Sequence, residues 1–191
     1  MRNEELGITN KSSESSDNMP EYGKTLKIIS YLLEYPDEQW RQNFDEDREA
    51  LNELDNQQTK TVLSELFDYI EKYGDKEYEN LYVQSFDFSQ NTNLYLTTHD
   101  RTDFGKQANE MHEYKTLFLE NGFDLDHELP DYLPAILELA ASVPKESAVK
   151  ILQLAKSKIE LLRDRFIEAK LAHAFLLDIV LKINDELHNT N

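Results

Sequence analysis

The sequence predicts an all-α protein, a single-domain helical bundle of about seven to nine helices. All five glycines lie before residue 123 and no proline follows Pro144, so helices can run without interruption through the C-terminal third. Apolar residues recur there at three- and four-residue steps, as they do on one face of a helix. A chain of 191 residues can bury a substantial core and suits one domain.

Residues 1–20 have the composition of a polar tail. They contain several serines and acids but no apolar run that could form the core of a signal peptide. We therefore predict a disordered polar N-terminal tail at 1–20 and an all-helical domain at 21–188.

Proline, aspartate and glycine punctuate the helices of the first half. The first predicted helix covers Tyr22 to Tyr35 and stops at Pro36, because the residue before a proline disfavours the helical region. Asp37 is placed to cap a second helix, and Gly74 to end a third. Asp75 is placed to cap a fourth helix that continues towards residue 86.

Two later segments need separate arguments. Residues 93–99 are rich in types that favour extended structure, but no second strand-like run is available as a partner, so a helix or ordered loop is predicted. The apolar pattern after residue 145 is longer than most single helices. We expect a break near Arg163 to Lys170.

Two prolines four residues apart mark the start of another helix. Pro130 and Pro134 confine that start between them, because proline is tolerated only in the first turn. Asp131 is predicted as its cap or first-turn acid, and it lies nearly in line with Glu138 on one face. These carboxylates either line a groove or are simply solvated on a surface helix. The apolar face carries Tyr132, Leu133, Ile136, Leu137 and Ala140.

The charge balance indicates which partners fit. The chain has 38 acidic and 20 basic residues and a net charge of -18, which argues against nucleic acid and anionic membranes and favours a basic peptide. The longest apolar stretch, Ala174 to Leu181, is interrupted by Asp178 and is too short to cross a bilayer. With no cysteine as well, a soluble, cytoplasmic protein without stable membrane insertion is expected.

The residues give little support to catalysis. Glycines are too sparse for a nucleotide-binding loop, and no glutamate stands three residues before a histidine, as carboxylate-bridged metal sites in helical bundles require. We therefore predict no enzyme activity, no cofactor and no metal. A helical metal- or nucleotide-dependent enzyme is kept as the alternative. The histidines considered are His99, His112, His127, His173 and His188.

Three ordered blocks of sequence resemble a known family. They are residues 81–88 (LYVQSFDF), 94–99 (LYLTTH) and 128–134 (ELPDYLP) followed by Leu137-Glu138, and residues 31–37 (YLLEYPD) resemble the family's opening. This pattern is similar to the TorD, DmsD and NarJ redox-enzyme maturation chaperones. Tyr132 stands where the wider family typically has histidine, which points to the NarJ branch. The likeness covers about residues 22 to 141.

The resemblance implies an all-helical, non-enzymatic chaperone for nitrate reductase assembly. Such a protein would bind the apo α subunit of membrane-bound nitrate reductase at its N-terminal segment and permit molybdenum cofactor insertion before membrane docking. A monomer and a domain-swapped homodimer both stay open. Core packing is the alternative role for Phe86 and Tyr95, and capping for Asp87. The client-peptide residues are predicted to be Phe86, Asp87, Tyr95, His99, Glu128, Asp131, Tyr132 and Glu138.

Overall fold

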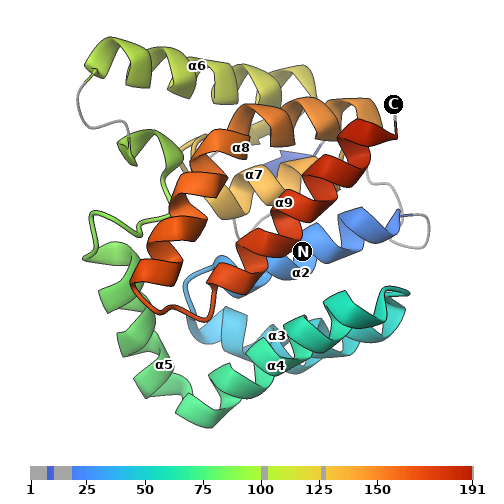
Figure 1. Ribbon diagram of the computed structural model, residues 1–191, viewed down its shortest axis with the longest axis vertical. Helices are drawn as coiled ribbons and strands as arrows, with labels where there is room; N and C mark the ends of the chain where they lie inside the picture. Colours follow the sequence, from blue (N-terminus) through green and yellow to red (C-terminus); the bar gives the residue numbers. More distant parts are fainter. Residues whose placement is uncertain (1–7, 11–18, 100–102, 126–127, 191) are drawn as a thin grey trace.

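The computed structural model describes residues 8–10, 19–99, 103–125 and 128–190. Within these ranges the chain forms eight α-helices in one compact body (Figure 1), which confirms the predicted all-α bundle. No helix in the described ranges is long and apolar enough to cross a membrane. The helices are α2 (Glu21–Leu33), α3 (Glu38–Glu49), α4 (Gln57–Tyr73), α5 (Asp75–Tyr82), α6 (Phe104–Glu120), α7 (Leu133–Ala141), α8 (Lys145–Glu168) and α9 (Ala174–Asn189).

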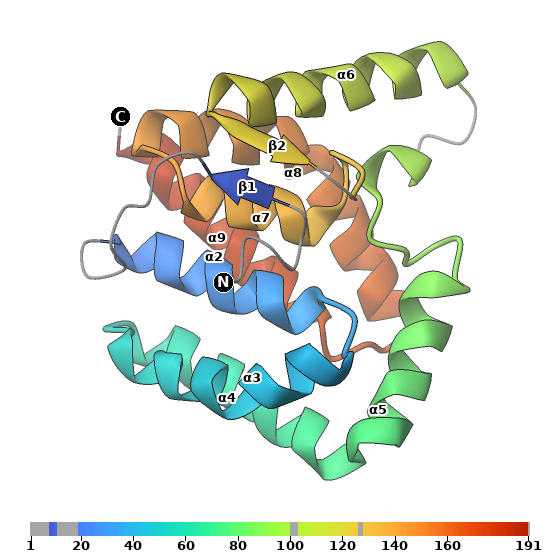
Figure 2. The ribbon, with the colours of Figure 1, turned by 180° about the vertical axis from the view of Figure 1, so that it is seen from behind.

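The short helix α7 lies at the centre of the bundle. It packs against α2 and α8, and α8 packs in turn against α9, while α6 and the α3–α5 group lie at opposite ends of the molecule (Figures 1 and 2). All nine residues of α7 are buried, including Glu138. The predicted separation into an apolar and an acidic face is therefore wrong, and so is the alternative of a surface helix with solvated acids.

Two contacts allow α2 to lie directly on α7. A Cβ atom at Gly23 would come within 3.0 Å of the Ala141 carbonyl oxygen and 2.8 Å of Met19 Cγ, so this crossing has no room for a side chain. Further along, the Ser30 hydroxyl donates a 2.8 Å hydrogen bond to the carbonyl oxygen of Pro134. That carbonyl lies in the first turn of α7, so α2 and the start of α7 are locked in register.

Local sequence signals account for most helix ends. The Asp37 side chain accepts a 2.8 Å hydrogen bond from the Trp40 amide and caps α3, as predicted. Gly74 ends α4 with a φ of 77°, a conformation that favours glycine. Asp75 does not cap α5, because Gly74 occupies the cap position and Asp75 is the first helical residue. α8 ends at Glu168, within the predicted break.

The described residues contain two extended features, a paired strand and a single β-bridge beside the helical turn that confirms the helix or ordered loop predicted at 93–99. Strand β1 (Ile8–Asn10), inside the segment predicted to be a disordered tail, pairs antiparallel with β2 (Phe123–Leu125). Residues 1–7 and 11–18 of that tail lie outside the described ranges. Within 93–99, Leu96–His99 forms the short 3₁₀ helix η4, but Tyr95 forms a β-bridge with Tyr132. The bridging partner, a helix N-cap residue, has no strand-like sequence around it.

His173 is buried in an aromatic part of the core, between α8 and α9. Its Nε2 atom lies 2.9 Å from the Tyr78 hydroxyl, and its ring meets the Phe86 ring edge-on at 5.0 Å. Burial lowers the pKa of His173 to about 4. The imidazole is therefore neutral in the folded protein at pH values where the unfolded chain would protonate it.

We expect His173→Phe to reduce the acid sensitivity of the fold. A histidine whose folded pKa is lowered contributes full stability above its unfolded pKa of 6.5 and loses it as the pH falls towards 4. The loss amounts to about 3 kcal/mol for a shift of this size. Urea unfolding between pH 7 and pH 4.5 measures it.

Tyr78→Phe is the control, because it removes the hydrogen bond but keeps the imidazole. It should lower stability by about 1 kcal/mol and retain the pH dependence of the parent protein. Equal pH dependence in His173→Phe and the parent would contradict this account.

Candidate functional site

Three segments that are distant in sequence meet at the start of α7. The backbone of 94–96 runs beside that of 131–133, with Leu96 N donating to the Asp131 carbonyl at 3.0 Å and Leu133 N to the Leu94 carbonyl at 2.9 Å. The end of α2 and the π-helical turn η3 (Val83–Asp87), which follows α5, contribute side chains to the same region. The buried helix α7 thereby fixes the backbone from which the candidate site is built.

Asp131 joins two of these segments through hydrogen bonds of its side chain. It is fully buried, and its Oδ2 atom accepts hydrogen bonds from the Thr97 amide at 3.0 Å and the Thr97 hydroxyl at 2.7 Å. Its Oδ1 atom has no hydrogen-bond partner among the described residues. The predicted role as helix cap or first-turn acid is wrong, since Tyr132 is the N-cap and α7 begins at Leu133.

Burial raises the pKa of Asp131, although both hydrogen bonds from Thr97 act in the opposite direction. The carboxylate therefore favours protonation more than an exposed aspartate does. Because Asp131 is buried and bonded to Thr97, it positions the neighbouring segments and does not line a groove.

Tyrosines and carboxylates gather above Asp131 in an arrangement that we call the tyrosine–carboxylate cluster. The rings of Tyr95 and Tyr132 lie 5.1 Å apart, and the Tyr95 hydroxyl donates a 3.0 Å hydrogen bond to Glu128 Oε1. The ring of Tyr35 meets that of Tyr82 edge-on at 5.6 Å. The cluster consists of Glu34, Tyr35, Tyr82, Asp87, Tyr95, Glu128 and Tyr132.

Burial and the nearby carboxylates raise the pKa values of the tyrosines. Burial raises the pKa of Tyr95, and the charge and hydrogen bond of Glu128 raise it further. Burial also raises the pKa of Tyr132, to which the charges of Glu34 and Glu128 add. Asp87 contributes to the raised pKa values of both Tyr35 and Tyr82, after larger effects of hydrogen bonding or burial. The hydroxyls are therefore protonated donors at neutral pH.

The cluster is open to solvent on one side. Asp87 is exposed, Tyr95 and Glu128 are half-buried, and Tyr35 is 40% exposed. Tyr82 and Tyr132 form the buried floor. Phenol rings and carboxylates are thus presented together, which suits a ligand that carries both apolar groups and positive charge.

The structure places the predicted client residues in two groups. Asp87, Tyr95, Glu128 and Tyr132 belong to the cluster, with Asp131 directly beneath them. Asp87 makes no capping hydrogen bond among the described residues.

The other three predicted residues lie elsewhere. Phe86 packs in the core against Tyr82, Phe166 and His173. His99 is buried, with Nε2 2.9 Å from the Asn93 carbonyl and Nδ1 against the Arg165 guanidinium. Glu138 is 1% exposed and faces Lys27, whose Nζ lies 3.6 Å from its Oε1 atom.

Three members of the cluster were not among the predicted client residues. Glu34 and Tyr35 come from the end of α2, and Tyr82 from the end of α5. The family-like stretch at 31–37 contains both Glu34 and Tyr35, so the resemblance carried a signal for them. The periodicity of apolar residues could not identify Glu34 and Tyr35, because it gives no information on contacts with residues about a hundred positions later.

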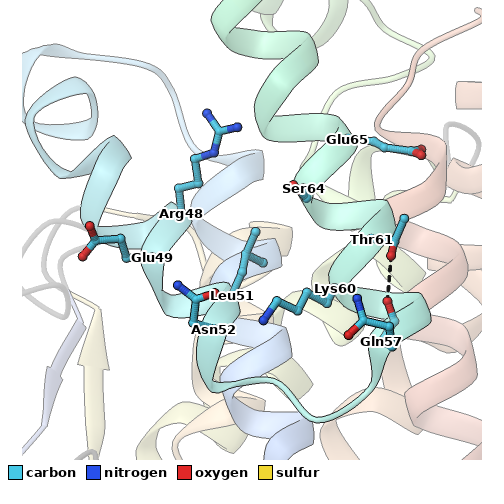
Figure 3. A pocket seen from close by; sticks show the side chains of 9 residues that line it. All are labelled: Arg48, Glu49, Leu51, Asn52, Gln57, Lys60, Thr61, Ser64 and Glu65. Carbon is cyan, nitrogen blue, oxygen red and sulfur yellow. Dashed lines mark hydrogen bonds between the residues drawn. The ribbon is translucent and has the colours of Figure 1, made fainter.

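Two hollows lie outside the cluster itself. One, of about 450 Å³, lies between α3 with the 3₁₀ turn η2 (Ala50–Glu53) and α4. Figure 3 shows that Arg48, Glu49, Lys60 and Glu65 surround it together with uncharged polar side chains. The second, of about 230 Å³, adjoins Pro36. No group of three potential metal ligands occurs in the part of the chain that the structure describes.

Comparison with known proteins defines the class as that of assembly chaperones. No family model matches the chain. It is 31% identical over 158 residues to the probable nitrate reductase molybdenum cofactor assembly chaperone NarJ of Bacillus subtilis, covering 82% of this chain and 86% of that protein. It is also similar to two Escherichia coli K12 proteins. The nitrate reductase molybdenum cofactor assembly chaperone NarJ is 29% identical, and the match covers 83% of this chain and 68% of that protein. The probable assembly chaperone NarW is also 29% identical, and the match covers 83% of this chain and 67% of that protein.

The chain belongs to the NarJ family of assembly chaperones. The relatives are chaperones and not catalysts, which confirms the prediction of a protein that is not an enzyme. The predicted family, drawn from short blocks of sequence, is confirmed over most of the chain.

We expect Asp131→Asn to gain stability relative to the parent protein as the pH rises from 4 to 7. Because the folded pKa of Asp131 is raised above 3.8, the folded protein retains a proton that the unfolded chain releases. Stability from this group is present below pH 3.8 and is lost as the pH rises through the folded pKa. Each unit of pKa difference is worth about 1.4 kcal/mol. Urea unfolding at both pH values measures the change.

Thr97→Val in the parent protein sharpens the test. It removes the hydroxyl hydrogen bond that lowers the pKa of Asp131, so the loss of stability with rising pH should become larger. The account fails if the stability difference between Asp131→Asn and the parent is the same at pH 4 and pH 7.

Proposed function

We propose that this chain is a cytoplasmic chaperone for a membrane-bound respiratory nitrate reductase. It binds the apo α subunit at its N-terminal segment and enables molybdenum cofactor insertion and assembly before the enzyme docks at the membrane. The named role of the relatives supports the enzyme system. The observation that carries the proposal is the tyrosine–carboxylate cluster, which is partly open to solvent and pairs apolar rings with negative charge.

The chemistry of the cluster suits a basic, amphipathic peptide. Apolar anchors of the client can pack on the exposed faces of Tyr35 and Tyr95. These two rings pack in turn against the buried rings of Tyr82 and Tyr132. Lysine or arginine side chains of the client can pair with Asp87 and Glu128 at the rim. The net charge of -18 attracts such a peptide over longer distances and speeds its association.

The phenol hydroxyls add a second kind of recognition. Their pKa values are raised, so they remain protonated and can donate hydrogen bonds to backbone carbonyls at the exposed end of a client helix. Glu128 accepts the Tyr95 hydroxyl in the free protein. Client binding then exchanges this internal hydrogen bond for contacts with the peptide.

Calorimetric titration with a peptide copying the N-terminus of the nitrate reductase α subunit tests the proposal. We expect micromolar or tighter binding at low salt and weaker binding at high salt, because the rim pairs are exposed to screening. Asp87→Asn/Glu128→Gln should weaken binding by about tenfold.

The matched control is Asp55→Asn/Glu120→Gln. It removes the same amount of charge from exposed positions outside the cluster. Asp55 lies just before the start of α4, and Glu120 is the last residue of α6. It should leave the affinity within about twofold. Equal weakening by both double variants would reduce the effect to net charge and contradict a defined site. No binding by the folded parent protein at low salt would overturn the proposal.

A further inference from the structure

The hollow beside Pro36, where α3, α4 and α5 meet, has an aromatic floor. Trp40, Phe44 and Tyr78 line it, and the Trp40 ring centroid lies 5.3 Å from that of Phe44 and 5.9 Å from that of Tyr78. Trp40 and Tyr78 are buried, whereas Phe44 is half-buried. Phe44 is therefore the ring that offers accessible surface to a ligand.

The rim of this hollow carries uncompensated negative charge. Its cation, Arg41, already pairs with Glu79 at 3.6 Å and donates to the Pro36 carbonyl. Two further residues of the lining, Asp45 and Asp75, are exposed, and their side chains make no ion pair or hydrogen bond with any residue that the structure describes. A ligand in the hollow therefore meets an apolar ring below and two carboxylates above.

We propose that this hollow binds an arginine side chain of a peptide. A planar guanidinium can lie on an aromatic face while its edge donates hydrogen bonds to carboxylates, and its methylene stem covers apolar surface. An anionic group would be repelled by Asp45 and Asp75. An uncharged apolar group would leave both carboxylates without a partner.

The hollow lies next to the tyrosine–carboxylate cluster. Pro36 lines the hollow, and its neighbour Tyr35 belongs to the cluster. The Tyr35 hydroxyl donates to Glu79, the same residue that pairs with Arg41. One ridge of side chains thus separates the two sites, so a peptide held at the cluster can place an arginine in the hollow. This link to the client rests on the proposed function, whereas arginine binding itself does not.

Trp40 is the single tryptophan of the chain, so its fluorescence reports on this hollow directly. The experiment titrates the full chain with N-acetyl-arginine amide and, in parallel, with the uncharged N-acetyl-citrulline amide. We expect a saturable change with the arginine compound at millimolar concentration and at least about tenfold weaker binding of the citrulline compound.

Asp45→Asn/Asp75→Asn should weaken binding of the arginine compound by at least about fivefold, because both carboxylates lose their charge. Asp55→Asn/Glu120→Gln removes the same amount of charge elsewhere and should leave the titration unchanged. Circular dichroism verifies that each variant is folded before titration.

An absent or unsaturable fluorescence change in the folded parent protein overturns the proposal. So does an equal response to the citrulline compound, or an equal loss in the two double variants. None of these titrations contains the client peptide, so their failure leaves the proposed chaperone function standing. Conversely, a chain that fails to bind the client can still bind the arginine compound.

Discussion

Complete burial of α7 is the constraint on which the rest of this structure depends. A nine-residue helix buried on all sides needs close partners, and α2 meets it with no side chain at Gly23 and with a hydrogen bond from Ser30 to Pro134. The start of α7 then fixes Tyr132, which bridges to Tyr95. The candidate site is consequently built on the edge of the core and not on a free loop, which keeps its geometry defined before any client arrives.

The carboxylates near α7 divide into two kinds. Asp131 and Glu138 are buried, one receiving two hydrogen bonds from Thr97 and the other facing Lys27. Removing water from such groups is costly, so their partners chiefly offset that cost and hold neighbouring segments in place. Asp87 and Glu128 remain accessible to solvent and can meet a ligand at little desolvation cost. We therefore propose that Asp87 and Glu128 meet the client, and that the buried Asp131 and Glu138 do not.

Helix positions followed well from local chemistry. Pro130 and Pro134 bracketed the start of α7, Asp37 capped α3, and Gly74 ended α4, because each acts on its own backbone within a few residues. The burial of Glu138 could not be predicted in the same way. A single acid in a nine-residue helix looks like a polar face until the helices on every side are known.

The site was partly predictable from short blocks of sequence. Family-like blocks contained Asp87, Tyr95, Glu128 and Tyr132, which the structure brings together. The block around 31–37 contributes Glu34 and Tyr35 only because α2 packs against α7, a contact between residues about a hundred positions apart. Phe86 takes the alternative role of core packing, and an aromatic beside predicted site residues looks the same in sequence whether it faces the core or a ligand.

Hydrogen–deuterium exchange with and without the α-subunit peptide tests the central claim most directly, namely that the client binds at the tyrosine–carboxylate cluster. The account predicts slower exchange on binding in 33–36, 84–98 and 128–132, with no comparable change in α9. Protection confined to segments outside the cluster, with 84–98 and 128–132 unchanged at saturating peptide, would contradict it.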